Sequence, residues 1–182
     1  MSEIRITLPI TDADIEKINA GDKVFLTGEM LVARDAAHKR LYEAMQNGEA
    51  LPVDIRGETV YYMGPSPARE GQVIGSAGPT TATRMDKYTP ALLDAGLKAM
   101  IGKGKRSEAV IAAMKKNHAV YLAAVGGCGA LLSQCIVASE VLCYDDLGTE
   151  AVRRIRVENF PCIAAIDCKG NDLYLASQKE EK

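Results

Sequence analysis

Three cationic side chains stand in short loops rather than on expected helix faces. Arg34 lies in VARDAAH, Arg84 in GPTTATRMD and Lys103 in IGKGK. Loops at strand ends are where α/β proteins build binding sites. An arginine fork binds a carboxylate through two hydrogen bonds, and a lysine adds a compact positive charge. Together these residue types are suited to a small dianion, but a solvated surface charge is the simpler interpretation of each cation, and spacing alone does not decide between them.

Two threonines precede Arg84 at an expected helix start. Thr80 and Thr81 follow Gly78-Pro79. A hydroxyl in such a place can orient water or exchange a proton, provided that nearby positive charge lowers its pKa. The same hydroxyl can instead cap the helix by accepting a backbone N–H, which is the interpretation that these residues alone favour.

His38 is expected on the first turn of the helix that follows Arg34. It is a candidate acid or base, or a phosphoryl acceptor, but a place on the helix surface is the simpler interpretation. Two glycine-rich stretches, 102–104 and 126–129, contain the small residues that phosphate cradles use. Neither matches the P-loop or the dinucleotide-binding pattern, so this phosphate signal is weak.

Length and composition predict one globular domain. The chain has 182 residues, of which 47% are hydrophobic and 25% charged, as in ordinary globular proteins. We expect a single domain over 1–182, with a frayed polar tail at 177–182. The net charge of -2 argues against nucleic-acid binding. The sequence has no stretch that reaches the roughly 20 apolar residues of a membrane helix, and no signal-peptide pattern at its start, so we expect a cytoplasmic protein.

The spacing of the five cysteines argues against a metal site in this chain. They are Cys128, Cys135, Cys143, Cys162 and Cys168. An odd number with irregular gaps indicates neither a disulfide framework nor a paired-cysteine metal site. We therefore expect reduced thiols, most of them packed in the core as small hydrophobic groups.

Hydrophobic periodicity and turn residues indicate an α/β protein with a mixed sheet and helices packed on it. The expected strands are 4–10, 23–32, 72–78, 97–101, 119–125 and 137–143, with a hairpin over 54–63 and a closing hairpin that joins 162–167 to 172–176. The expected helices follow Thr11, span 34–47, begin at Thr89-Pro90, span 107–117 and begin near Ala130.

Several segments together resemble a known family. These are ARDAAH, YYMGPSPA, SAGPTTATRMD, MIGKGK, VGG and YDDLGTEAVRRIRVENFPCIAAIDCKGNDLY. In this order they resemble the β subunit, equivalently the C-terminal domain, of the class I iron–sulfur hydro-lyases, which comprise class I fumarases and L-tartrate dehydratases. The resemblance runs from about Ile4 to Leu175, nearly the whole chain.

The resemblance implies a swivelling β/β/α domain that pairs with an α subunit. In the family, cysteines of the α subunit bind a [4Fe–4S] cluster, and these ligands have no counterpart here. The family's dicarboxylate-binding cations fall on Arg34, Arg84 and Lys103. Its proton-transfer threonine falls on Thr80, with Thr81 beside it. The expected function is that of the β subunit of a two-subunit class I fumarate hydratase, which hydrates fumarate reversibly to (S)-malate.

Two alternatives remain beside that function. One is the β subunit of an L-tartrate dehydratase, whose substrate carries one more hydroxyl group. The other is a non-catalytic or phosphohistidine carrier domain, since swivelling domains also serve as carriers, with His38 as the acceptor. A chain that begins with Met1 just ahead of its first expected strand suggests a separately encoded α partner. In isolation the chain is a candidate homodimer.

Overall fold

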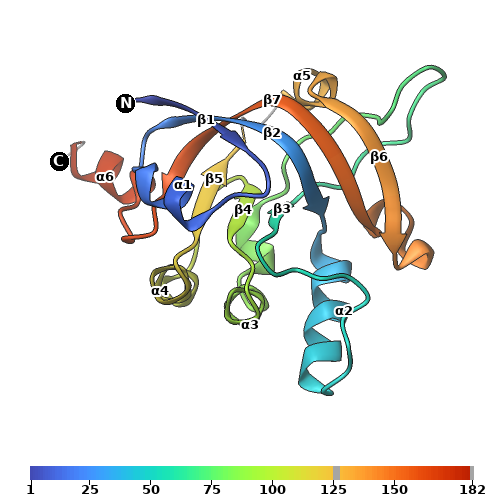
Figure 1. Ribbon diagram of the computed structural model, residues 1–182, viewed down its shortest axis with the longest axis horizontal. Helices are drawn as coiled ribbons and strands as arrows, with labels where there is room; N and C mark the ends of the chain where they lie inside the picture. Colours follow the sequence, from blue (N-terminus) through green and yellow to red (C-terminus); the bar gives the residue numbers. More distant parts are fainter. Residues whose placement is uncertain (125–127, 181–182) are drawn as a thin grey trace.

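The computed structural model describes residues 1–124 and 128–180, and strands alternate with helices along most of this length (Figure 1). The strands are β1 (Glu3–Thr7), β2 (Lys23–Val32), β3 (Thr59–Tyr61), β4 (Ala99–Gly102), β5 (Val120–Ala123), β6 (Ile136–Cys143) and β7 (Val152–Ile166). The α-helices are α1 (Asp12–Lys17), α2 (Asp35–Gln46), α3 (Thr89–Asp94), α4 (Glu108–Asn117), α5 (Gly129–Gln134) and α6 (Leu173–Glu180). Two 3₁₀ turns are η1 (Ala82–Met85) and η2 (Asp145–Glu150).

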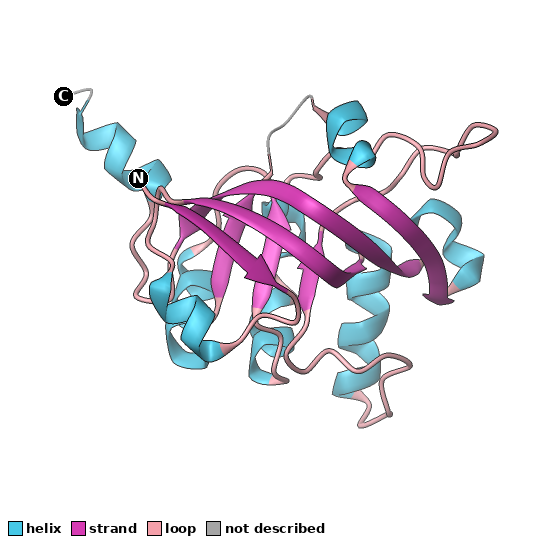
Figure 2. Cartoon of the chain, turned by 45° about the horizontal axis from the view of Figure 1, so that its top comes forward, coloured by secondary structure: helices cyan, strands magenta, loops and turns pink. Residues whose placement is uncertain are grey.

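The described strands form one mixed sheet in the order β1-β2-β3-β4-β5-β7-β6. Neighbours from β1 to β5 run parallel, whereas β7 runs antiparallel to β2, β5 and β6. Because β7 pairs with both β2 and β5, the central strands close into a ring. The long strands arch over the short parallel ones in Figures 1 and 2. The expected α/β fold with a mixed sheet is confirmed.

Two hydrophobic cores lie on opposite faces of the short parallel strands. Tyr61 of β3 and Phe160 of β7 belong to the core between the two layers of strands. Tyr62 and Leu93 belong to the second core, which α2, α3 and α4 cover on the lower side of Figure 1. The chain therefore has three layers, strands over strands over helices. None of the described helices is long and apolar enough to span a bilayer.

The helix starts follow from their capping residues. Thr11 accepts a hydrogen bond from the Asp14 N–H, and the Asp14 carboxylate accepts one from the Thr11 N–H, a capping box that begins α1. Ser107 accepts from Val110 N–H and begins α4. Proline at the first turn of α3 removes an N–H that the helix would leave unpaired. These starts agree with the sequence pattern.

The longest strand, β7, is longer than the sequence predicts. Periodicity indicates a strand only over 162–167, yet β7 spans 15 residues. Ile155 and Val157 face the core between the strand layers, and the next inward residue is Phe160. The alternation slips at Asn159, where φ is +48° and the pairing with β2 shifts register. A bulge of this kind interrupts the two-residue period that identifies strands in a sequence.

Three other expectations are wrong. The segment 54–63 is not a hairpin, because β3 is its single strand and pairs in parallel with β2 and β4. Residues 72–78 contain no strand. The second arm of the closing hairpin is instead the start of α6, held to β7 by one bridge between Ile166 and Asp172. The expected polar tail is helical through Glu180, and 181–182 lie outside the described residues.

Candidate active site

The predicted cations gather at one edge of the sheet, where β2, β3 and β4 end. Arg34 follows β2 by two residues, and Lys103 directly follows β4. Arg84 lies in η1, on the segment that connects β3 with α3. Because β2, β3 and β4 are parallel neighbours, their carboxyl ends bring these segments to the same edge. Ligands of open α/β sheets bind at this kind of edge.

The segment that carries the two threonines crosses the end of β3 and continues beside β4. The Thr80 N–H donates to the Tyr62 carbonyl at 2.7 Å, and the Lys103 N–H donates to the Thr80 carbonyl at 3.3 Å. The Ala82 N–H in turn donates to the Lys103 carbonyl at 2.8 Å. Thr81 and Lys103 thus form a short parallel bridge. Backbone pairing therefore fixes the threonines relative to the lysine.

Helix capping does not account for these threonines. η1 begins after Thr81, whose side chain makes no capping hydrogen bond. Thr80 lies one residue further upstream, outside the cap position, and is half-buried, whereas Thr81 is exposed. The hydroxyl of Thr80 therefore stands at the surface of the strand edge without a role at a helix start.

Close backbone packing explains two glycines that the phosphate interpretation singled out. A Cβ atom at Gly102 would stand 2.8 Å from the Tyr62 ring, and one at Gly129 would stand 2.9 Å from the Gly78 nitrogen. Only glycine lets the threonine segment lie this close to β4 and to the start of α5. The neighbouring residues 126–127 lie outside the described part of the chain.

Arg34 is the cap residue of α2, and its side chain contacts Glu150 and Gly64. Its Nε is 3.5 Å from Oε1 of Glu150, and its side chain is 24% exposed. The same Glu150 oxygen accepts the Ala36 N–H at 3.3 Å, so this carboxylate also stabilises the start of α2. A Cβ atom at Gly64 would stand 2.4 Å from Nη1 of Arg34. Glycine at position 64 therefore makes room for the arginine.

Arg84 reaches the residue next to Arg34. Nη2 of Arg84 forms an ion pair with Oδ2 of Asp35, and the arginine side chain remains 51% exposed. Lys103 is exposed and forms no ion pair with the described residues. The edge thus presents two arginines and a lysine. Glu150 and Asp35 neutralise part of the arginine charge, and the lysine charge has no such partner among the described residues. Such a surface attracts a small dianion.

His38 is buried, so its expected place on the helix surface is wrong. The residue is only 1% exposed. Nδ1 lies 2.8 Å from the Arg34 carbonyl, which makes Nδ1–H the donor and Nε2 the unprotonated nitrogen. Burial lowers the pKa of His38 to about 4, so the ring is neutral at physiological pH. Its ring packs edge-on against Tyr62 at 5.3 Å.

Sequence reasoning missed Arg106 and Asp86, which join the two loops of the site. The Arg106 side chain has 0% exposure, and its Nε donates to Oδ1 of Asp86 at 2.7 Å. Its Nη2 donates to Oγ1 of Thr89 at 2.9 Å. The other oxygen of Asp86 accepts the Ser107 N–H at 2.6 Å. The pair lies 20 residues apart in sequence, so no local pattern could have indicated it.

The described residues do not fit an iron–sulfur cluster. They contain no group of three or more His, Cys, Asp or Glu side chains that could hold a metal ion. Cys162 and Cys168 are buried, and the other three cysteines are half-buried and free. Burial raises the pKa of the Cys162 thiol, which disfavours the thiolate that iron requires. We derive no metal chemistry from this chain.

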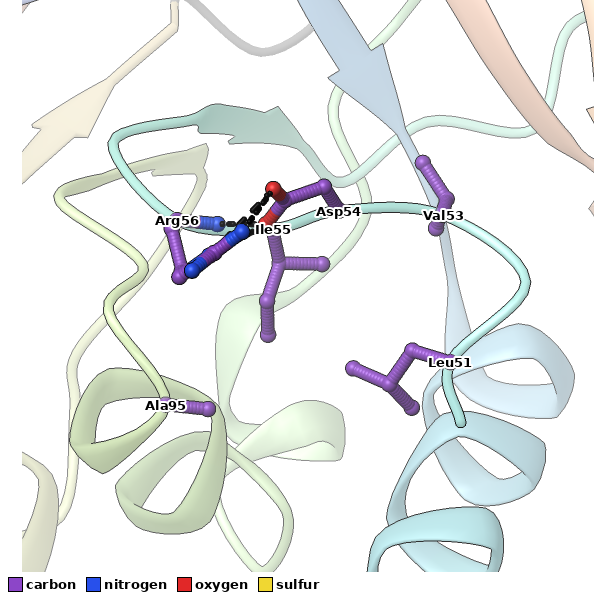
Figure 3. Close-up of a pocket in the computed structure, with 6 residues that line it drawn as sticks. All are labelled: Leu51, Val53, Asp54, Ile55, Arg56 and Ala95. Carbon is purple, nitrogen blue, oxygen red and sulfur yellow. Dashed lines mark hydrogen bonds and ion pairs between the residues drawn. The ribbon is translucent and has the colours of Figure 1, made fainter. Parts of the chain in front are cut away.

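The pocket in Figure 3 lies away from the candidate site. It has a volume of about 330 Å³ and is lined by Leu51, Val53, Asp54, Ile55, Arg56 and Ala95. These residues precede β3 or follow α3, and thus stand before the amino ends of β3 and β4. Its one cation, Arg56, is paired with Asp54 at 2.7 Å. The pocket therefore offers no uncompensated charge to a dianion.

The fold is a mixed α/β domain with three cationic side chains at one edge of its sheet. Its sequence assigns the family: the Fumarase C-terminus model matches residues 1–177. The chain belongs to the Fumarase C-terminus family, and the resemblance drawn from its motifs is confirmed.

Individual relatives fall into two groups by length. The chain is 42% identical over 164 residues to the aerobic class I fumarate hydratase of Escherichia coli K12, covering 89% of this chain and 30% of that protein. It is 43% identical over 156 residues to fumarate hydratase 2 of Leishmania major, covering 85% of this chain and 28% of that protein. The chain thus spans about a third or less of these relatives.

A shorter relative matches almost end to end. The chain is 36% identical over 171 residues to a putative L(+)-tartrate dehydratase subunit beta of Methanocaldococcus jannaschii. The match covers 91% of this chain and 88% of that protein. Relatives of both names are hydro-lyases, so the chain belongs to a hydro-lyase family.

Proposed function

We propose that this chain is the β subunit of a two-subunit class I fumarate hydratase of the cytoplasm. It contributes half of a site that hydrates fumarate reversibly to (S)-malate, and it is active only with an α subunit. The observation that carries the proposal is the grouping of Arg34, Arg84 and Lys103 beside Thr80 at one sheet edge. The similarity to class I fumarate hydratases supports the substrate.

The cations bind the substrate carboxylates. Arg84 and Arg34 carry guanidinium groups suited to carboxylate oxygens, and Lys103 adds a third positive charge. Removing the C3 proton of malate places charge on the adjacent carboxylate. Cations already positioned at that carboxylate stabilise this charge more in the transition state than in the ground state. The roles of Arg34, Arg84 and Lys103 follow from this chemistry.

Thr80 exchanges the C3 proton in this proposal. A threonine hydroxyl is a weak base at its ordinary pKa, so positive charge must favour its deprotonated form. Backbone pairing holds Thr80 against Lys103, with Thr81 bridged to the same lysine. This proximity is the feature that supports a proton-transfer role for Thr80 and a substrate-binding role for Thr81.

The open surface of the site supports an α partner. Thr81, Arg84 and Lys103 are exposed, and Arg34 and Thr80 are half-buried. A dianion bound there needs a second wall to exclude water. We assign that wall and the [4Fe–4S] cluster to the α subunit, because the described residues of this chain offer no ligand set. The similarity to a protein named subunit beta supports a two-subunit enzyme.

The alternatives differ in support. An L-tartrate dehydratase β subunit would use the same cations, and the similarity to the putative tartrate dehydratase subunit favours it as the second candidate. A phosphohistidine carrier needs an accessible imidazole, whereas Nε2 of His38 is buried and Nδ1 is engaged by the Arg34 carbonyl. The burial of His38 argues against the carrier.

Anaerobic coexpression with a cluster-bearing α subunit tests the proposal. We expect a stable complex that interconverts fumarate and (S)-malate, with a lower kcat/KM for L-tartrate. A kcat/KM that is higher for L-tartrate than for malate would instead identify the chain as a tartrate dehydratase β subunit. A complex that turns over neither substrate, or the absence of any complex, would refute the proposed enzyme.

A further inference from the structure

A further arginine, Arg153, lies at the same end of the sheet as Arg34. In the antiparallel pairing of β2 with β7, Arg153 stands directly opposite Val32. Val32 precedes Arg34 by two residues in the sequence. Opposite residues of an antiparallel pair have side chains on the same face of the sheet. Val32 and Ile155 both belong to the core between the strand layers. Arg153 therefore stands on the inner face, where this core ends at the cation-rich edge.

Arg153 lacks the partners that its neighbours have. Its Nε is buried and has no hydrogen-bond partner among the described residues. By contrast, the adjacent Arg154, on the outer face, lies 3.0 Å from Glu58 and 3.8 Å from Glu29. Arg153 as a whole is half-buried, but a buried guanidinium nitrogen is normally paired. An unpaired donor on the inner face thus calls for an acceptor that the described residues do not supply.

Other unpaired polar atoms occur close by. Nε of Arg34 is buried and has only the Glu150 carboxylate near it, at 3.5 Å. Oδ1 of Asp35 is buried without a hydrogen-bond partner among the described residues. So is Oγ of Ser139 in β6, which stands opposite Ile155 on the other side of β7. Figure 1 shows β7 between β2 and β6, so these atoms come from adjacent strands and the helix start that follows β2.

We propose that Arg153 is a substrate-binding residue that donates hydrogen bonds to a carboxylate of the bound dicarboxylate. This inference rests on the proposed function and extends it, because it adds a cation from β7 to those of β2, η1 and β4. It makes carboxylate recognition depend on β7, whose register with β2 positions Arg153 opposite Val32, at the end of β2 that leads to Arg34.

Nuclear magnetic resonance of the arginine side chains tests the contact in the full chain. The chain is labelled with [¹⁵N]arginine and titrated with succinate, an unreactive dicarboxylate. We expect the Nε–H signals of Arg153 and Arg34 to shift together and saturably, and that of exposed Arg156 to stay in place. Arg153→Lys assigns the signal by its disappearance. If the Arg34 signal shifts and the Arg153 signal does not, the inference is wrong.

Kinetics of the assembled enzyme provide the second test. Arg153→Met should raise KM for malate by about tenfold or more, since hydrogen bonds to charged groups are strong, with a smaller change in kcat. Arg156→Met, on the same strand but exposed, is the matched control and should stay within about twofold. An equal effect of both variants would overturn the role of Arg153. If Arg84→Met also has no effect, the proposed function itself fails.

Discussion

Nδ1 of His38 donates a hydrogen bond to the Arg34 carbonyl over 2.8 Å, so a buried imidazole holds the backbone of a cation at the candidate site. The hydrogen bond lies within the first turn of α2, whose cap residue is Arg34. A neutral ring serves this purpose, because only Nδ1 carries a proton. Protonation of the buried Nε2 would place an uncompensated charge in the core.

His38 should therefore make stability depend on pH. Its pKa is about 4 in the folded chain against 6.5 for an ordinary histidine. The unfolded chain takes up this proton first, so stability is full above pH 6.5 and decreases as the pH falls towards 4. The expected loss is about 3 kcal/mol. Denaturant titrations at several pH values measure it. His38→Asn should flatten this part of the profile, and an unchanged profile would contradict the assignment.

Arg84→Lys tests the guanidinium fork in the assembled enzyme. Lysine retains the positive charge but cannot bind a carboxylate through two parallel hydrogen bonds. We expect kcat/KM for malate to fall by about 10- to 150-fold, equivalent to roughly 1.5–3 kcal/mol. Lys87→Arg changes a nearby exposed cation and serves as the control. Wild-type kinetics in a folded Arg84→Lys enzyme would make Arg84 a surface charge.

Thr80→Ala separates proton transfer from structure. Loss of a proton-transfer group should lower kcat by about 10²- to 10⁴-fold, with little change in melting temperature, because Thr80 caps no helix. Thr80→Ser should recover part of the rate. Turnover and melting are measured on the same samples. A melting decrease with turnover within about threefold of wild type would remove Thr80 from the catalytic residues.

Asp86→Ala should destabilise the chain severely. It would leave the fully buried Arg106 guanidinium without its carboxylate partner and should cost about 3–5 kcal/mol of unfolding free energy. Asp54→Ala removes the partner of the exposed Arg56 and should cost much less, because solvent screens exposed ion pairs. Chemical denaturation compares the two variants. Equal losses would show that the buried pair does not hold the two loops together.

Iron incorporation tests whether the α subunit, and not this chain, binds the cluster. The purified chain, treated anaerobically with iron and sulfide, should acquire no stoichiometric [4Fe–4S] absorbance, because its cysteines lack cluster spacing. The α subunit under the same conditions is the positive control. A stoichiometric cluster on this chain would contradict the proposed arrangement.

Some elements at the candidate site follow from the sequence, whereas the hairpin expected over 54–63 is the single strand β3. The strand 23–32 coincides with β2, and the helix predicted over 107–117 corresponds to α4. Apolar periodicity and a side-chain cap specify these elements locally. The positions of Arg34 and Lys103 after β2 and β4 follow from the same local signals, whereas Arg84 lies in η1 and no strand forms over 72–78. Their roles in binding stay predictions.

Features that depend on distant contacts were not predictable from local patterns. The bulge at Asn159 shifts the inward face of β7, so no uniform alternation marks that strand. His38 is buried on α2 and packs against Tyr62, a residue of another segment of the chain. The pairing of Arg106 with Asp86 is specified by the packing of two loops. Each is a tertiary property that a single sequence window does not contain.

The double pairing of β7 also sets the order in which the chain can fold. β2 lies near the start of the chain, yet β7, which pairs along nearly all of β2, lies near the end. β7 must also pair with β5. Contacts so distant in sequence carry a large loop-closure entropy and slow folding. The ring, and with it the pairing of Arg153 opposite Val32, cannot exist before β7 docks. Anion binding should therefore be among the last properties to appear during refolding.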